Sequence, residues 1–221
     1  MLTIYTDIAG PITPMSREGY KYVISFREQK TKLFYTISMK DLTQVPAAIQ
    51  QYVIAMKNDI LSIPIVPQLT ILHSDSATVY LSSESKKVLS NHGILTAAST
   101  PYHPTANSVA ERGWRSAFDL ARTLLSQATK LSSFIDNTFW SQAIQHATLV
   151  INLTNLSHGS SNKSAFETIT NKSPTIIFVG QAVGQLQSHR INEYKIIFYF
   201  YFYFYFIIID INMHNRFYYI I

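Results

Sequence analysis

The order in which hydrophobic periodicity changes along this chain constrains its fold more than any other feature. Three β-rich runs come first, at residues 2–8, 20–26 and 32–38. Each combines β-branched and aromatic residues in the way that strands do. Short polar or glycine-containing stretches separate the runs, so we predict that they form antiparallel neighbours in a three-stranded meander.

After these runs, the spacing of apolar residues changes from every second residue, as in a strand, to every third or fourth residue, as in a helix. Residues 43–60 carry apolar side chains at helical spacings, and Pro46 is tolerated in the first turn of the helix that this pattern predicts. Residues 68–72 predict a short strand. Because a strand reached through a crossover helix normally pairs in parallel within the same sheet, we expect this strand to join the meander.

Four more elements complete the pattern. Residues 82–91 predict a short helix and 94–97 a last strand, while two long helices are predicted from about residue 107 and over 139–153. The resulting order, βββαβαβαα, is typical of an α/β fold in which helices flank a mixed sheet.

The amino-acid composition at the end of the chain differs from that of the preceding residues. Residues 195–209 are a low-complexity run of alternating Phe and Tyr bounded by Ile. The run alternates like a strand and is shorter than the roughly 20 apolar residues of a membrane helix, so we expect no membrane anchor. We predict one domain over residues 1–180 and a tail over 181–221 that is not a functional domain.

Charge and composition narrow the possible partners. The formal charge of +5 suits a polyanion. The absence of cysteine excludes disulfides and thiolate zinc sites, and the seven histidines include no i, i+4 pair. The first residues have no positively charged leader before Asp7, so we expect an intracellular protein.

Three separated carboxylates are candidate metal ligands. Asp7 lies at the end of the first strand, Asp75 follows the fourth strand, and Glu111 begins the long helix. Two-metal phosphoryl chemistry needs hard oxygen ligands that converge on two ions, which three Asp or Glu residues can supply.

The motifs around these acids resemble a known family. Thr6–Pro11, His73–Asp75 and Pro101–Arg112 together are similar to the integrase catalytic core of copia-type LTR retrotransposons. Thirty-five residues lie between the second and third acids, as in the D,D-35-E signature of integrases and related transposases. Phe139–Ile144 and Ser164–Thr168 also look like that family, and the resemblance covers about residues 2 to 180.

The resemblance implies a fold and a reaction. The fold would be RNase H-like, a mixed five-stranded sheet with the strands of Asp7 and Asp75 adjacent. Asp7 would bridge two Mg²⁺ (or Mn²⁺) ions, Asp75 would complete one site and Glu111 the other. The reaction would be 3'-end processing of the element's DNA followed by strand transfer into target DNA. A homo-oligomer is implied, acting in the nucleus after assembly in cytoplasmic virus-like particles.

Four residues are candidates for contact with DNA. Arg115 lies one helical turn beyond Glu111 and Arg122 two turns further, so both share roughly its face of the helix. Tyr102 and His103 lie in the loop before Glu111, where they could meet a strand end. The alternative for both arginines, ordinary solvated charges, stays open.

The sequence differs from the family's pattern at several positions. Ser76–Tyr80 stands where relatives carry an Asn-Gly-Gly-Glu-Tyr-like turn, and Asn107–Glu111 lacks the usual glycine. Gly113 is expected to cost the helix about 1 kcal/mol relative to alanine, and Trp114 replaces an Asn. These departures favour an alternative function, a catalytically inactive nucleic-acid-binding or interaction module derived from an integrase. A different RNase H-like nuclease is a third, remoter possibility.

Overall fold

The computed structural model describes most of the elements that the sequence predicts. The residues that it describes are 2–57, 70–74, 80, 82–98, 108–154, 163–170, 175–178, 195–201 and 204–210. They divide into two compact units, residues 1–171 and 172–221. The extent of the functional domain, predicted as residues 1–180, stays a prediction.

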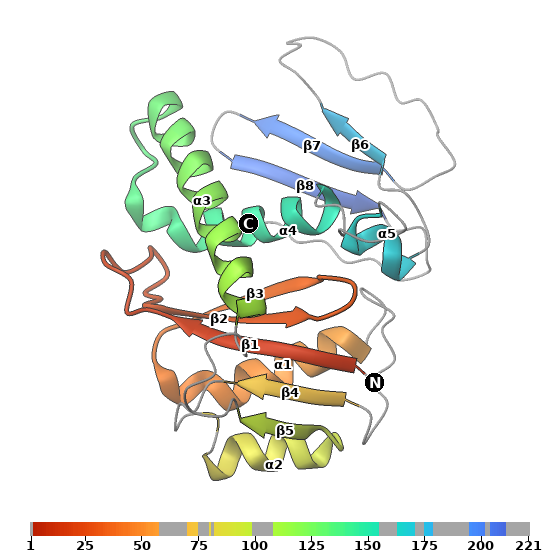
Figure 1. Cartoon of the computed structure of the whole chain (residues 1–221). Coiled ribbons are helices and arrows are strands. Elements are labelled where there is room, and N and C mark those ends of the chain that lie inside the picture. Colours follow the sequence, from red (N-terminus) through yellow and green to blue (C-terminus); the bar gives the residue numbers. More distant parts are fainter. Residues whose placement is uncertain are drawn as a thin grey trace. The chain divides into compact units, whose positions relative to one another are not determined.

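A five-stranded mixed sheet forms the centre of the first unit (Figure 1). Its strands are β1 (Leu2–Ala9), β2 (Tyr22–Glu28), β3 (Phe34–Met39), β4 (Thr70–Ser74) and β5 (Leu95–Ala98). They lie in the order β3-β2-β1-β4-β5. The first three pair antiparallel, whereas β4 pairs in parallel with both β1 and β5. The predicted meander and the predicted parallel crossover are both confirmed.

Helices cover both faces of this sheet. They are η1 (Leu42–Gln44), α1 (Val45–Lys57), α2 (Ser83–Asn91), α3 (Ser108–Leu131), η3 (Asn137–Phe139), α4 (Trp140–Thr154) and α5 (Ala165–Thr170). In Figure 1, α1 and α2 lie against one face, and α3 and α4 against the other. The predicted order βββαβαβαα is confirmed, and with it the mixed five-stranded sheet.

The alternation of side chains along each strand divides the hydrophobic core in two. Ile4 and Ile24 point toward α1 and join the larger cluster. Val23, one position away from Ile24, points toward α3 and α4 and joins the second. Because successive residues of a strand face opposite sides, Asp7 shares the α3/α4 face of the sheet with Ala9.

Gly113 lets α3 lie close to the sheet. A Cβ atom at this position would lie 2.8 Å from Nη1 of Arg27 and 2.8 Å from Cε2 of Phe34. The Phe34 ring is fully buried and meets Trp114 edge-on, with 5.7 Å between the ring centroids. A methyl group at position 113 would therefore require the Phe34 ring to shift, a cost that the helix propensity of glycine does not include. Trp114, which the sequence marked as a replaced Asn, is a buried core residue stacked on Phe118.

Hydrogen bonds hold the loop between β1 and β2 against the start of α4. The indole N–H of Trp140 donates to the Pro14 carbonyl at 3.0 Å, and the Ser141 hydroxyl donates to Glu18 at 3.0 Å. The Gln142 amide donates to the other Glu18 oxygen. Burial opposes the charge of Glu18, but hydrogen bonds from its own backbone and these side chains hold its pKa below the usual range. The family-like segment that begins at Phe139 thus anchors the loop that follows Asp7.

The second unit contains a three-stranded sheet. Its strands are β6 (Thr175–Phe178), β7 (Lys195–Tyr201) and β8 (Phe204–Asp210). β6 pairs in parallel with β7, and β7 pairs antiparallel with β8. The strand-like alternation of the Phe/Tyr run therefore corresponds to an actual hairpin. None of the helices described in the chain is long and apolar enough to cross a membrane.

Deletion of residues 195–221 is predicted to leave the thermal unfolding of the first unit unchanged. The five-stranded sheet has both of its cores within residues 1–171, and exposed Phe/Tyr repeats promote aggregation. Differential scanning calorimetry of the full and the shortened chain measures this. A large fall in the melting temperature of the shortened chain would show that the tail contributes to the core, whereas better solubility alone agrees with the prediction.

Candidate functional site

Asp7 lies on the central strand of the sheet, between β2 and β4. Its backbone pairs with Ser25 of β2, and the Ser25 hydroxyl donates to the Asp7 carbonyl at 3.4 Å. One side-chain oxygen of Asp7 accepts the backbone N–H of Ile8 at 2.9 Å. The side chain is half-buried on the face that α3 covers. A carboxylate held in this way has a defined direction, which a metal ligand needs.

The strand that precedes Asp75 lies beside β1. Tyr5 and His73 are register partners, and their rings stack with 5.0 Å between centroids. Burial lowers the pKa of His73, which favours the neutral imidazole near pH 7. The predicted pairing of the two acid-bearing strands is confirmed. Asp75 itself lies outside the described residues, as do Tyr102 and His103, so their positions stay predictions.

Glu111 lies in the first turn of α3 and is exposed. Residues two apart on a helix point about 200° apart, so Gly113 and Glu111 lie on opposite flanks of α3. The Gly113 flank meets Arg27 on β2 and Phe34 on β3. The Glu111 side chain therefore lies away from that contact and is exposed, and its approach to Asp7 on β1 stays a prediction.

The two predicted arginines share the Glu111 flank of α3, as their spacing requires. Arg122 forms an ion pair with Asp119 at 3.1 Å, with both side chains largely exposed. Its guanidinium also lies over the Phe118 ring, 5.8 Å from the centroid. Such a surface pair contributes about 0–1 kcal/mol and opens easily. Arg115 is exposed, and DNA contact by either arginine stays a prediction.

The donor set fits divalent metal ions of the hard class. Asp7 and Glu111 offer carboxylate oxygens from a strand and a helix on one face of the sheet, which suits Mg²⁺ or Mn²⁺. Within the described ranges no three His, Asp or Glu side chains gather into a metal cluster. The third acid of the predicted set, Asp75, is not among those ranges.

A second charged feature lies on the other flank of α3, and the sequence did not predict it. Arg27 at the end of β2 lies beneath the first turns of α3, with its guanidinium 5.9 Å from the Phe34 ring centroid. Burial lowers the pKa of Arg27, and the charge of Arg112 lowers it further. The spacing of apolar residues does not mark Arg27, since its side of β2 carries Val23 and the polar Ser25 before it.

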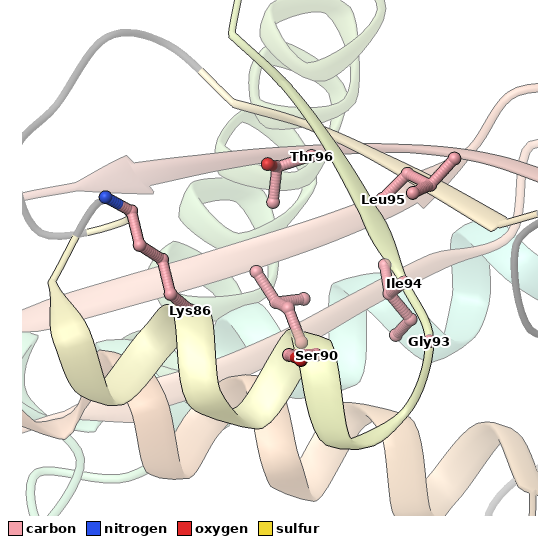
Figure 2. A pocket seen from close by; sticks show the side chains of 7 residues that line it. Lys86, Ser90, Gly93, Ile94, Leu95 and Thr96 are labelled. Atoms are coloured by element: carbon pink, nitrogen blue, oxygen red, sulfur yellow. The ribbon is translucent and has the colours of Figure 1, made fainter.

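An open pocket lies elsewhere on the first unit, between α2 and β5. Figure 2 shows Lys86 and Ser90 on α2 opposite Ile94, which precedes β5, and Leu95 and Thr96 within β5. Its volume is about 440 Å³, and its lining contains one charged group, Lys86, and no carboxylate. This pocket therefore does not suit a metal-ion site.

The chain is similar in sequence to transposon polyproteins. It is 28% identical over 149 residues to the retrovirus-related Pol polyprotein from transposon TNT 1-94 of Nicotiana tabacum, which covers 67% of this chain and 10% of the relative. It is 29% identical over 164 residues to the truncated transposon Ty1-A Gag-Pol polyprotein of Saccharomyces cerevisiae, covering 73% and 13%. The chain thus spans only about a tenth of the length of these relatives. No family model matches it.

Solved integrases have the same fold. The HTLV-2 integrase catalytic core domain, solved with magnesium in a trimeric form, matches with a TM-score of 0.54 at 15% identity, covering 76% of this chain and 95% of that one. The BIV integrase catalytic core domain matches with a TM-score of 0.51 at 16% identity, covering 76% and 93%. A chain of the simian T-cell lymphotropic virus intasome, bound to a PP2A regulatory subunit, matches with a TM-score of 0.55 at 17% identity, covering 85% and 60%. The chain is therefore a relative of retrotransposon Pol and Gag-Pol polyproteins and has the RNase H-like fold of the integrase catalytic core.

Proposed function

We propose that this chain is the catalytic core of a retrotransposon integrase, which processes the 3' ends of the element's DNA and joins them to target DNA. The observation that carries the proposal is the arrangement of the sheet. β1 and β4 are parallel neighbours, and α3 begins on the face that Asp7 shares. This arrangement, together with the relationship to Pol polyproteins, supports carboxylate-dependent phosphodiester chemistry.

Three acids would hold the metal ions in this proposal. Asp7 would be the ligand common to both, Asp75 would complete one site and Glu111 the other. Bound divalent ions would supply Lewis acidity and a reactive oxygen nucleophile at neutral pH. The hydrogen bond from the Ile8 N–H directs the Asp7 carboxylate, and the stacked Tyr5 and His73 rings fill the adjoining stretch of the sheet.

The reaction consists of two displacements at phosphorus. In the first, water attacks a phosphodiester near the element's end, the P–O3' bond breaks, and the 3' oxygen leaves as a free hydroxyl after taking a proton. In the second, that 3'-OH attacks a target phosphate, so that one phosphodiester forms as another breaks. Neither step needs an oxidant or a nucleotide cofactor.

DNA and further copies of the chain are the proposed partners, and the nucleus is the proposed site of action. The related structures include an intasome and a trimeric form of an integrase core, which supports DNA binding and oligomerisation in this chain. The alternative function is a binding or interaction module without turnover. Ser76–Tyr80, which departs from the family's glycine-containing turn, favours that alternative.

Divalent metal is expected to stabilise the fold through the three acids. At ten times its dissociation constant, Mg²⁺ or Mn²⁺ should add about 1.4 kcal/mol and raise the melting temperature by about 3–6 °C. Asp75→Asn removes a ligand charge with little change of shape, so it should weaken this response. In the metal-free protein it should leave stability equal or higher, because carboxylates that converge repel each other. Thermal melts with and without metal provide the measurement.

The matched control for this experiment is Asp119→Asn. Asp119 is an exposed carboxylate on α3, paired with Arg122, and its loss should not alter the metal response. If metal stabilises the wild type and the Asp7→Asn, Asp75→Asn and Glu111→Gln variants equally, no shared site exists. The binding-module alternative would then replace the proposed enzyme. Incubation of the wild type with tagged element ends tests the reaction itself, since joined products distinguish strand transfer from cleavage.

A further inference from the structure

The outer edge of β3 is a surface at which another strand could pair. β3 is the terminal strand of the five-stranded sheet, so only one of its two sides pairs with β2. Residues 33–39, Leu-Phe-Tyr-Thr-Ile-Ser-Met, contain no charged residue, no proline and no glycine. Uncharged β-forming segments of roughly this length pair readily with the same segment of another copy when an edge is exposed. A contact that covers this edge therefore affects whether the chain self-associates.

The hydrogen bonds of the β2–β3 turn show which backbone groups of β3 point outward. The Glu28 N–H donates to the Leu33 carbonyl at 2.9 Å, so Leu33 directs its backbone groups toward β2. Along an antiparallel strand, successive residues direct these groups alternately toward the neighbouring strand and away from it. Phe34, Thr36 and Ser38 consequently direct their N–H and C=O groups away from β2, along the outer edge.

One side chain of α4 binds both outward groups of Phe34. The Phe34 N–H donates to Oδ1 of Asn152 at 2.9 Å, and Nδ2 of Asn152 donates to the Phe34 carbonyl at 2.7 Å. The amide thus supplies the donor and the acceptor that the backbone of an added strand would supply. One helical turn earlier, the Thr148 hydroxyl lies 3.1 Å from the Thr36 hydroxyl. The same face of α4 therefore covers two successive outward-pointing residues of β3.

The core holds Asn152 against this edge. Its neighbours in the sequence, Ile151 and Leu153, are both buried. Ile151 belongs to the same hydrophobic cluster as the Phe34 ring, beneath α3 and α4. In Figure 1, α4 lies on that side of the sheet, and α4 contacts β3. The Asn152 amide can leave the edge only if this part of α4 moves as well, so the contact is a fixed part of the fold.

We propose that Asn152 blocks the outer edge of β3 and prevents it from pairing with the same edge of a second copy of the chain. Its amide occupies the place at which an added strand would bind the Phe34 backbone. A strand that displaced the amide would leave its donor and acceptor without their partners, which costs free energy. This role involves neither metal nor DNA, and it goes beyond the proposed enzyme.

The experiment replaces the Asn152 amide by a carboxylate of nearly the same shape. Asn152→Asp can still accept the Phe34 N–H, but an ionised carboxylate cannot donate to the Phe34 carbonyl. In dilute protein, hydrogen exchange over residues 33–39 should become about 3- to 10-fold faster, as the loss of one hydrogen bond implies. Sedimentation velocity of the full chain at rising concentration should show larger species than the wild type forms.

Two further variants identify the surface responsible. Gln145→Glu makes the same change, amide to carboxylate, at an exposed position of α4, and it should exchange and sediment like the wild type. Ser38→Pro removes an outward N–H of β3 without breaking a hydrogen bond to β2. The Ser38 hydroxyl is buried with no hydrogen-bond partner among the described residues, so its loss breaks no contact. Added to Asn152→Asp, Ser38→Pro should restore the sedimentation of the wild type.

Asn152→Ala opens the edge without adding a charge, and it replaces the aspartate variant if circular dichroism shows that Asn152→Asp does not fold. The proposal is overturned if the folded variant sediments like the wild type. It is also overturned if the larger species persist after Ser38→Pro is added, because association would then use another surface. If neither variant folds, Asn152 is required for the fold itself and the proposed role is wrong. All measurements are made without metal and DNA, so the success or failure of the proposed enzyme does not alter them.

Discussion

Asp7→Asn is expected to lower the rate of metal-dependent strand transfer by about a thousandfold. The reason is that Asp7 is the proposed ligand common to both ions, and loss of its charge would remove about 4 kcal/mol of transition-state stabilisation. Asparagine keeps the shape of the side chain and can still accept the Ile8 N–H at one oxygen. The fold should therefore persist, and single-turnover assays with tagged element ends at saturating protein measure the loss.

Binding measurements separate this effect from a loss of DNA affinity. The salt dependence of DNA binding should be the same for Asp7→Asn and the wild type, because phosphate attraction depends on the cations. Asp119→Asn should retain full activity as the matched carboxylate control. An Asp7→Asn protein with activity within a factor of about three of the wild type would contradict the proposed role.

Gly113→Ala is expected to destabilise the first unit by about 1–3 kcal/mol, although helix propensity alone predicts a gain of about 1 kcal/mol. The added methyl group would lie 2.8 Å from the Phe34 ring, which is buried and held by Trp114. Arg27 can swing away because its guanidinium is the end of a flexible chain, but the ring cannot. Urea unfolding of both proteins gives the sign directly, and the melting temperature should fall by about 2–10 °C.

A double-mutant cycle identifies the ring as the cause. Phe34→Leu destabilises by itself, but Gly113→Ala should cost much less in that background, giving a coupling energy of at least about 1 kcal/mol. Ser116→Ala, on the exposed side of the same helix, controls for propensity and should be neutral or slightly stabilising. Equal stabilisation by both alanines would mean that α3 does not approach the sheet as closely as described.

The helices and strands could be predicted because the spacing of apolar residues differs between a helix and a strand. The three strands of the meander, the crossover helix over 45–57 and the long helix from 108 all lie within a few residues of the ranges that apolar spacing predicts. The pairing of β1 with β4 followed from the handedness and direction rules for crossovers. Periodicity is a local property, so a single sequence suffices for it.

Close contacts between distant segments could not be predicted in this way. Gly113 and Trp114 looked like losses within the helix, because their value depends on Phe34, which belongs to another element. The position of Arg27 beneath α3 went unnoticed for the same reason, since the strand and the helix lie far apart in the sequence. The three acids were found from their places at two strand ends and a helix start together with the family resemblance, and the position of Asp75 stays a prediction.

The hydrogen bonds between the β1–β2 loop and α4 affect the order in which the chain folds. The Trp140–Pro14 hydrogen bond closes a loop of 126 positions, whose closure entropy is about 4 kcal/mol. The β1–β2–β3 meander is local and can form early, whereas the loop reaches its final partner only when α4 exists. At about 5–20 residues per second, synthesis supplies α4 roughly 6–25 seconds after β1. Nascent chains should therefore carry a paired meander whose connecting loop stays accessible to protease until α4 has been synthesised.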